Sequence, residues 1–158
     1  MLRLSACRGS AGAGRPSSSN IESITCAVGR ESHGARDKVR AAIAKLEALR
    51  DRFEREFGIR TNTVLGNLYR DGRDSMGWHR DHEPELGPDP HVVSLSLGAS
   101  RDFDVRRDAD RLTQRFALGH GDLILMGTES QTKWTHSIPK RLKIKKLRIN
   151  LTFRQVIC

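Results

Sequence analysis

A histidine and an aspartate two residues apart, His79 and Asp81, are the pair in this sequence best spaced for metal chemistry. Side chains at positions i and i+2 of a β-strand point to the same side, so an imidazole and a carboxylate here can share one ion. His136, in another expected strand, would add a third ligand. Two histidines and one carboxylate leave three coordination positions open, which non-haem Fe(II) uses to activate O2. A lone H-x-D pair is also common as a surface or hydrogen-bonded feature.

Residues 147–154 alternate strictly between apolar and polar side chains, which predicts a strand with Arg148, Asn150, Thr152 and Arg154 on one face. Two arginines on one face could hold a dicarboxylate, because a guanidinium pairs with a carboxylate through a two-pronged fork. An ordinary half-exposed strand would show the same alternation. Neighbouring strands could therefore present a metal site and an anion site together.

The remaining histidines allow a zinc hydrolase as a competing interpretation. His82, His91 and His120 could each contribute a zinc ligand. However, His91 begins an apolar strand and His120 lies in a turn, and neither has the i, i+2 geometry of the H-x-D pair. His33 lies in a segment without a regular pattern. A zinc site is therefore the minor alternative.

Residues 1–36 are rich in Gly, Ser and Arg without apolar periodicity, and we expect them to be mostly irregular. From Asp37 onward, apolar residues recur at steps of three and four, which predicts an amphipathic helix. We expect Asp37 to cap its start and Gly58 to end it. The apolar stripe consists of Val39, Ala42, Ile43, Leu46, Leu49, Phe53 and Phe57.

After Gly58 the pattern changes to short strands separated by turns, of which Asp71-Gly72 and His120-Gly121 are the clearest. One helix followed by about eight strands predicts a mainly β fold, a double-stranded β-helix or jelly roll, with the helix on an outer face. No Gly-rich phosphate loop is present, so a nucleotide cofactor has no support. The expected strands are 61–69, 77–82, 91–97, 102–106, 113–118, 121–126, 132–138 and 147–157.

The composition fits one domain with a polyanionic partner. A chain of 158 residues with 37% hydrophobic residues buries about 70% of the surface that its unfolded form exposes. With 28 Lys and Arg against 19 Asp and Glu, the net charge of +9 favours DNA or RNA, although anionic membranes also attract basic surfaces. No apolar run approaches the 18 or so residues needed to span a bilayer, so we expect no membrane association. We also expect a monomer.

The composition of the N-terminus indicates where in the cell the protein could be located. Residues 1–21 contain three arginines and no acidic residue, the composition of an organelle transit peptide, although a disordered tail or a misassigned start codon would look similar. Three widely spaced cysteines fit a reducing, intracellular compartment, either nucleus or organelle. The three cysteines are Cys7, Cys26 and Cys158.

The motifs together resemble the AlkB family of Fe(II)/2-oxoglutarate dioxygenases. N-L-Y-R-D-G at 67–72 and W-H-R-D at 78–81 are similar to the family signature N-x-Y-x-D-G…H-x-D. R-I-N-L-T-F-R at 148–154 matches its R-x-N-L-T-F-R motif. The resemblance covers residues 61–156, and three further segments follow the family's order: S-L-S-L-G at 94–98, R-D-F at 101–103 and W-T-H-S-I-P at 134–139.

The resemblance implies that 37–158 is a dioxygenase domain in which His79, Asp81 and His136 hold Fe(II). Arg148 and Arg154 would hold the two carboxylates of 2-oxoglutarate, which is the co-substrate together with O2. In this family 2-oxoglutarate is oxidised to succinate and CO2, an N-alkyl carbon is hydroxylated, and the alkyl group leaves as an aldehyde. The full set expected to bind 2-oxoglutarate is Asn67, Tyr69, Arg148, Asn150, Thr152 and Arg154.

The resemblance also implies a substrate, because the family acts on alkylated DNA or RNA bases such as N1-methyladenine and N3-methylcytosine. Such a base must leave its stack to reach buried iron. Lysines and arginines near the site could bind phosphates and make affinity salt-dependent, whereas a solvated charged loop is the plain alternative. The positions expected to contact substrate are His82, Glu83, Lys133, Lys140 and Arg141.

Two departures from the family pattern bear on this substrate. Related H-x-D-D-E sequences place an aspartate where this chain has His82, so the base preference is open. No aromatic residue precedes Phe53, whereas the family stacks the flipped base under an aromatic lid, and such stacking contributes about 1–3 kcal/mol. The expected function is oxidative dealkylation of nucleic-acid bases. The alternatives are an AlkB-like nucleic-acid-binding module with little turnover, and a 2-oxoglutarate oxygenase acting on protein or a small molecule.

Overall fold

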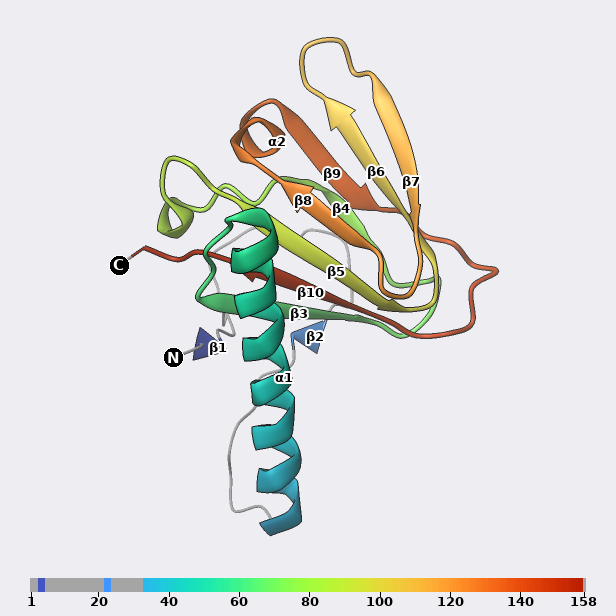
Figure 1. Ribbon diagram of the computed structural model, residues 1–158. Coiled ribbons are helices and arrows are strands. Elements are labelled where there is room, and N and C mark those ends of the chain that lie inside the picture. Colours follow the sequence, from blue (N-terminus) through green and yellow to red (C-terminus); the bar gives the residue numbers. More distant parts are fainter. Residues whose placement is uncertain (1–2, 5–21, 24–32, 158) are drawn as a thin grey trace, which may run out of the picture.

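The computed structural model places two β-sheets face to face, with one long helix outside the larger sheet (Figure 1). It describes the backbone of residues 3–4, 22–23 and 33–157 and the side chains of 37–157. Most of the expected transit peptide and all three cysteines lie outside these ranges. The elements are β1 (Arg3–Leu4), β2 (Glu22–Ser23), α1 (His33–Phe57), β3 (Thr63–Tyr69), β4 (Met76–His79), η1 (Pro84–Leu86), β5 (Val92–Gly98), β6 (Arg101–Arg107), β7 (Thr113–Leu118), β8 (Leu123–Met126), α2 (Thr128–Thr132), β9 (Trp134–Ile138) and β10 (Arg148–Arg154).

The strands from β3 onward are divided between the two sheets as a jelly roll requires. Within the described residues, the larger sheet has the order β1-β3-β10-β5-β8, with β2 also paired to β3, and the smaller has the order β4-β9-β6-β7. All pairs among β3–β10 are antiparallel. The predicted double-stranded β-helix is therefore confirmed, and each of the eight predicted strands corresponds to one of β3–β10 within three residues.

Helix α1 covers the outer face of the larger sheet, as the amphipathic stripe predicted. Its C-terminal half packs there through Phe53, whose ring meets Phe153 of β10 edge-on at 5.0 Å between centroids. The N-terminal half extends beyond the sheet (Figure 1). The helix ends at Phe57, where Gly58 has a φ of +69° and donates its N–H to the Glu54 carbonyl.

The start of α1 and the end of the β8–β9 connection differ from the sequence-based prediction. The helix begins at His33, so Asp37 lies inside it and does not cap it. The predicted strand 132–138 begins two residues late, because the short helix α2 occupies Thr128–Thr132. A single turn of helix is too short to show a period in the sequence. None of the described helices is long and apolar enough to cross a bilayer.

The core between the two sheets supports the candidate site. Buried side chains from both sheets meet there, so β4 and β9 are held in fixed positions relative to β3 and β5, the two neighbours of β10. Polar residues on the inner faces of these strands are consequently enclosed by apolar neighbours on one side. The buried apolar cluster consists of Tyr69, Val92, Phe103, Leu118, Met126 and Ile138.

Candidate metal and co-substrate site

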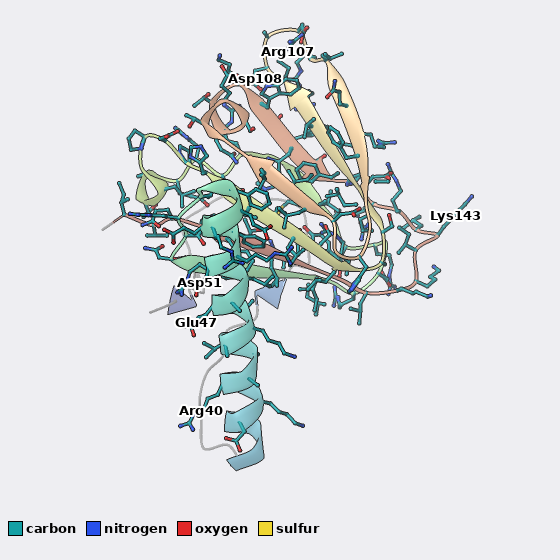
Figure 2. The ribbon with its side chains drawn as sticks, viewed as in Figure 1. Arg40, Glu47, Asp51, Arg107, Asp108 and Lys143 are labelled. Atoms are coloured by element: carbon teal, nitrogen blue, oxygen red, sulfur yellow. The ribbon has the colours of Figure 1, made fainter. Side chains whose placement is uncertain are left out.

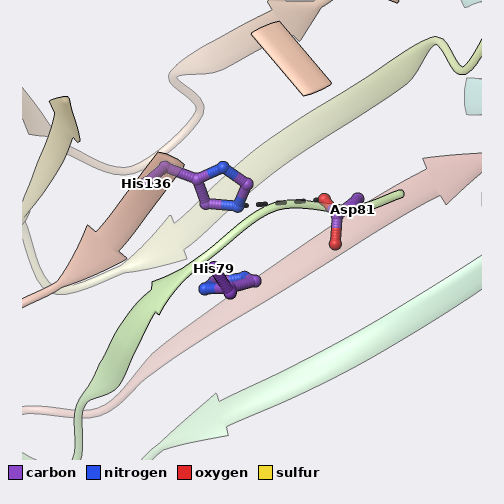
Figure 3. A group of neighbouring side chains, drawn as sticks. All are labelled: His79, Asp81 and His136. Atoms are coloured by element: carbon purple, nitrogen blue, oxygen red, sulfur yellow. Dashed lines mark ion pairs between the residues drawn. The ribbon is translucent and has the colours of Figure 1, made fainter. Parts of the chain in front are cut away.

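The three predicted metal ligands lie together, His79 and His136 on strands of the smaller sheet and Asp81 on the segment that leaves β4 (Figure 3). One potential ligand atom from each of His79, Asp81 and His136 lies within 4.8 Å of the others, and this is the only such cluster among the described residues. His79 ends β4 and is the register partner of His136 in β9. The Nε2 atom of His136 lies 3.9 Å from an Asp81 oxygen.

Both histidines can offer a ring nitrogen to a metal ion. His79 Nδ1 is 2.8 Å from the Gly77 carbonyl, which accepts a hydrogen bond from it, so Nε2 is the ring nitrogen available as a ligand. His136 is 6% exposed, and its burial, with the nearby His79, lowers its pKa to about 3. A metal ligand must be deprotonated, so this histidine is ready to bind at neutral pH.

The segment that carries Asp81 is held by Gln131, a residue that the sequence analysis did not single out. The Asp81 backbone N–H donates to Gln131 Oε1 at 2.9 Å, and Gln131 is fully buried. On the other side, Arg80 forms an ion pair with Asp108 at 2.8 Å and donates to the Thr132 carbonyl. Only the proximity of Gln131 to His136 in the chain could have indicated its role.

A cavity of about 180 Å³ joins the metal cluster to the inner face of β10. Arg148, 1% exposed, borders it and donates through Nη2 to Ser96 Oγ at 2.7 Å and to Asn150 Oδ1 at 2.8 Å. Its Nε and Nη1 have no hydrogen-bond partner among the described residues. Because a buried unpaired donor of a charged group costs about 1–3 kcal/mol or more, these atoms indicate a place for an anion.

The polar face of β10 forms one connected network in this cavity. Asn150 Oδ1 accepts from Ser94 Oγ at 3.0 Å, and Asn150 Nδ2 donates to Thr152 Oγ1 at 2.9 Å. Asn67 lies opposite Asn150 in the register of β3 and β10 and also lines the cavity. Alternation along the strand thus sends all these polar groups inward, as predicted, because the opposite face packs under α1.

Tyr69 lies beside Arg148 in the lining of the cavity. Its ring centroid is 5.2 Å from the Arg148 guanidinium carbon, and the residue is 3% exposed. Burial raises the pKa of the Tyr69 hydroxyl, although the nearby charges of Arg148 and Arg101 oppose this shift. The hydroxyl therefore stays protonated at neutral pH and can donate to a carboxylate.

Arg154 lies at the metal end of the same strand. Its Nη1 is 4.0 Å from an Asp81 oxygen and 3.1 Å from a Glu83 oxygen, and its buried Nε has no partner among the described residues. Glu83, predicted to contact substrate, also lines the cavity and is half-exposed. His82 is exposed and is not part of the cavity lining.

The basic residues predicted to contact substrate are divided between two places. Lys133 follows α2 and forms an ion pair with Glu129 at 2.5 Å. Lys140 and Arg141 follow Pro139 at the end of the barrel where Tyr69 and Arg148 are paired, away from Asp81. There Arg141 forms an ion pair with Asp102, also at 2.5 Å. The contact of these three residues with substrate stays a prediction.

A larger cavity of about 560 Å³ lies beside the small one but does not suit a dicarboxylate. It is bordered by the edge strands β7 and β8 and shares Phe103, Met126 and His136 with the small cavity. Its other lining side chains are mostly apolar, and no Lys or Arg of the described residues is among them. A doubly charged ligand would lose its hydration there, and no positively charged side chain would compensate for that loss.

The residues present fit a divalent iron and a dicarboxylate keto acid. Two imidazoles and one carboxylate whose ligand atoms lie together are the 2-His-1-carboxylate set that suits non-haem Fe(II). The unpaired donors of Arg148 fit one carboxylate, and the small cavity connects them to the metal ligands. The fold and the site together define a class of protein: a double-stranded β-helix whose site fits Fe(II), which activates O2, and an anionic co-substrate.

Comparison with known proteins gives the same class. A model of the 2OG-Fe(II) oxygenase superfamily matches residues 18–154. The DNA oxidative demethylase ALKBH2 of Homo sapiens is 41% identical over 123 residues, which cover 73% of this chain and 47% of that protein. The alpha-ketoglutarate-dependent dioxygenase alkB homolog 3 of Homo sapiens is 38% identical over 122 residues, with coverages of 70% and 42%. The chain therefore belongs to the 2OG-Fe(II) oxygenase superfamily and, with these relatives, to its AlkB family.

A solved structure supports the fold. The structure of OsALKBH1 superposes with a TM-score of 0.50 at 23% identity, covering 71% of this chain and 61% of the other. The chain spans less than half the length of the two curated relatives that it matches. The activity and substrate of those longer proteins are consequently matters for proposal.

Proposed function

We propose that the protein removes alkyl groups oxidatively from nucleic-acid bases. The observation that carries the chemistry is the buried Arg148, whose two unpaired donors share one small cavity with His79, Asp81 and His136. The choice of substrate draws on the names of the relatives, one of which is a DNA oxidative demethylase. In the proposed reaction the methylated base, 2-oxoglutarate and O2 give the free base, formaldehyde, succinate and CO2.

Each group of residues has a separate task in this reaction. His79, Asp81 and His136 would hold Fe(II), which supplies the oxidising power together with 2-oxoglutarate and O2. Arg148 would bind the far carboxylate of 2-oxoglutarate, with the protonated Tyr69 hydroxyl beside it as a second donor. These residues bind and orient, whereas the bound groups carry out the oxidation.

Surface charge supports a nucleic-acid substrate. The loop between β9 and β10 carries four exposed lysines for which no ion pair is found among the described residues, in contrast to Arg141. Lys143 points away from the barrel at the tip of this loop (Figure 2). Unpaired exposed cations suit the phosphate backbone, and binding through them weakens as salt rises. The four are Lys140, Lys143, Lys145 and Lys146.

The loop is also held in shape, so these charges are presented in a fixed arrangement. Gly72 donates its N–H to the Ile144 carbonyl at 2.8 Å, and its carbonyl accepts from the Arg141 N–H at 2.7 Å. A Cβ at Gly72 would lie 1.6 Å from the Arg141 carbonyl oxygen, so only glycine permits this approach. The D-G sequence at 71–72 therefore determines the conformation of the β9–β10 loop as well as that of its own turn.

Two coupled measurements test the proposal. Succinate formation with Fe(II) and 2-oxoglutarate is measured with and without an oligonucleotide that contains N1-methyladenine or N3-methylcytosine, while mass spectrometry follows loss of the methyl group. We expect demethylated product and succinate in equal amounts, and neither in His79→Ala. Succinate without any demethylation by the wild type would overturn the nucleic-acid substrate and favour a protein or small-molecule substrate. Oligonucleotide binding without succinate would favour a binding module.

A further inference from the structure

Arg101, the first residue of β6, is a charged side chain buried as deeply as the core. It is 1% exposed and belongs to the largest fully buried side chains of the described residues. Burying a guanidinium is costly unless it is hydrogen-bonded. Arg101 donates through Nη1 to the Asp71 carbonyl at 3.0 Å, and through Nη2 to the carbonyls of Asp74 at 2.8 Å and Pro139 at 2.9 Å.

These three carbonyls belong to the two connections that flank the metal-binding strands. Asp74 precedes β4 by two residues, and Pro139 directly follows β9. Met76 and Ile138 are register partners at that same end, and three residues further along β4 its last residue, His79, is paired with His136. One side chain therefore ties together the ends of both strands that carry the histidines.

The same guanidinium also contacts Tyr69, which lines the cavity. The Arg101 carbon Cζ lies 5.5 Å from the centroid of the Tyr69 ring, and Arg148 lies 5.2 Å from it. Tyr69 thus links Arg101 to Arg148, the arginine that borders the cavity. Arg101 itself does not line the cavity, so a bound ligand would not touch it.

We propose that Arg101 is a positioning residue that fixes the distance between the carboxylate anchor, Arg148 with Tyr69, and the strands of the metal ligands. This distance sets the chain length of the keto acid that can reach both ends. The inference rests on the proposed use of 2-oxoglutarate, but it is independent of the nucleic-acid substrate. A purely structural role would lower stability and leave the preference between keto acids of different length unchanged.

Calorimetric titration of the whole chain with Mn(II) in place of Fe(II) separates these roles without turnover. Each protein is titrated with 2-oxoglutarate and with 2-oxoadipate, which is longer by one methylene. A methylene mismatch in a fitted site changes affinity by about tenfold or more. We expect the wild type to prefer 2-oxoglutarate by about that factor. In Arg101→Lys, which keeps the charge and loses the fork, we expect the preference to fall severalfold while Mn(II) still binds.

Two variants accompany this measurement. Arg115→Lys is the matched control, because Arg115 lies on the neighbouring strand β7, forms its ion pair with Asp104 and contacts neither Tyr69 nor Pro139 in the described structure. It should keep the wild-type preference. Arg101→Met tests loss of the charge as well, and a thermal unfolding curve is recorded for every protein.

The outcomes are distinct. An unchanged preference in a folded Arg101→Lys protein would overturn the proposal, and so would failure of both Arg101 variants to fold, because Arg101 would then serve the fold alone. Absence of 2-oxoglutarate binding by the wild type would contradict the proposed function. A negative oligonucleotide assay, in contrast, would leave this inference intact.

Discussion

His136 lies directly opposite His79 in the antiparallel pairing of β4 and β9, with 4.2 Å between the centroids of the two imidazole rings. The pairing breaks register between Met76 and His79, and this irregularity accompanies the turn of His79 into the cavity. Asp81 follows two residues later, beyond the end of β4. The metal cluster is therefore built by one strand pair and the segment that leaves it.

Gln131 should control how firmly the site holds its metal. Gln131→Met keeps the volume of the side chain but removes the acceptor for the Asp81 N–H, so the Asp81 carboxylate becomes less fixed. Loss of such a supporting partner costs about 10–100-fold in metal affinity. Mn(II) titration measures the effect. Gln114→Met, on β7, is the control and should leave the affinity unchanged; equal affinities in the two variants would contradict this role for Gln131.

Arg148 should determine the affinity for 2-oxoglutarate. Arg148→Lys keeps a charge but loses the planar fork, and each lost charge-assisted hydrogen bond is worth about 1.5–3 kcal/mol. We expect the dissociation constant to rise about tenfold in Arg148→Lys and about hundredfold in Arg148→Met. Calorimetry with Mn(II) present measures both. Arg107→Met, at the far end of β6, should bind as the wild type does, and an unaltered Arg148→Met would refute the assignment.

Asp74 should make stability depend on pH in the acid range. Hydrogen bonds from Arg70 lower the pKa of Asp74 to about 2, whereas burial opposes this shift. An unfolded aspartate titrates near 3.9, so the unfolded chain binds the proton first and this stabilisation is lost as pH falls from about 4 to about 2.

The partner Arg70 is half-exposed, so solvent reduces the contribution to about 1–2 kcal/mol. Urea unfolding of wild type and Asp74→Asn between pH 6 and about pH 3 measures it. We expect the gap in unfolding free energy to narrow toward the acid end. A gap that is constant across this range would show that Asp74 does not titrate as described.

Phe53 should anchor α1 to the larger sheet. It is 4% exposed and contacts Phe153, so Phe53→Ala opens a cavity at that interface. Such truncations cost about 3–5 kcal/mol of unfolding free energy. Phe57, one turn later in α1, is 42% exposed, and Phe57→Ala should cost less than about 1 kcal/mol. Similar losses for the two variants in urea unfolding would contradict the packing described.

The alternation in β10 made the fold predictable from sequence. The H-x-D spacing predicted the metal cluster, although β4 ends at His79 and Asp81 lies beyond the strand on which the spacing argument placed it. Successive side chains of a strand point to opposite faces, so every second residue lies on the same face. Arg148, Asn150 and Thr152 share the face of β10 that points inward. Glu83 was predicted to contact substrate. Its hydrogen bond from Arg154 could be found only in the structure, because the sequence pattern does not predict where the side chain of a loop residue points. Its part in substrate binding stays a prediction.

The roles of two other supporting residues could not be predicted from the sequence, for a physical reason. Gln131 and Arg101 act through backbone atoms of segments far away in the chain, and an interaction of that kind leaves no spacing or pattern. The basic residues were predicted by composition to surround the site. Charge does not specify place, and Lys140 and Arg141 lie at the opposite end of β10 from Arg154.

Iron binding tests the central claim most directly. Equilibrium dialysis against Fe(II) without oxygen, followed by iron quantification, compares the wild type with Asp81→Ala and with His91→Ala, a histidine outside the cluster. We predict one iron per chain in the wild type and in His91→Ala, and none retained in Asp81→Ala. Equal iron in Asp81→Ala and the wild type would contradict the assignment of His79, Asp81 and His136 as the metal site.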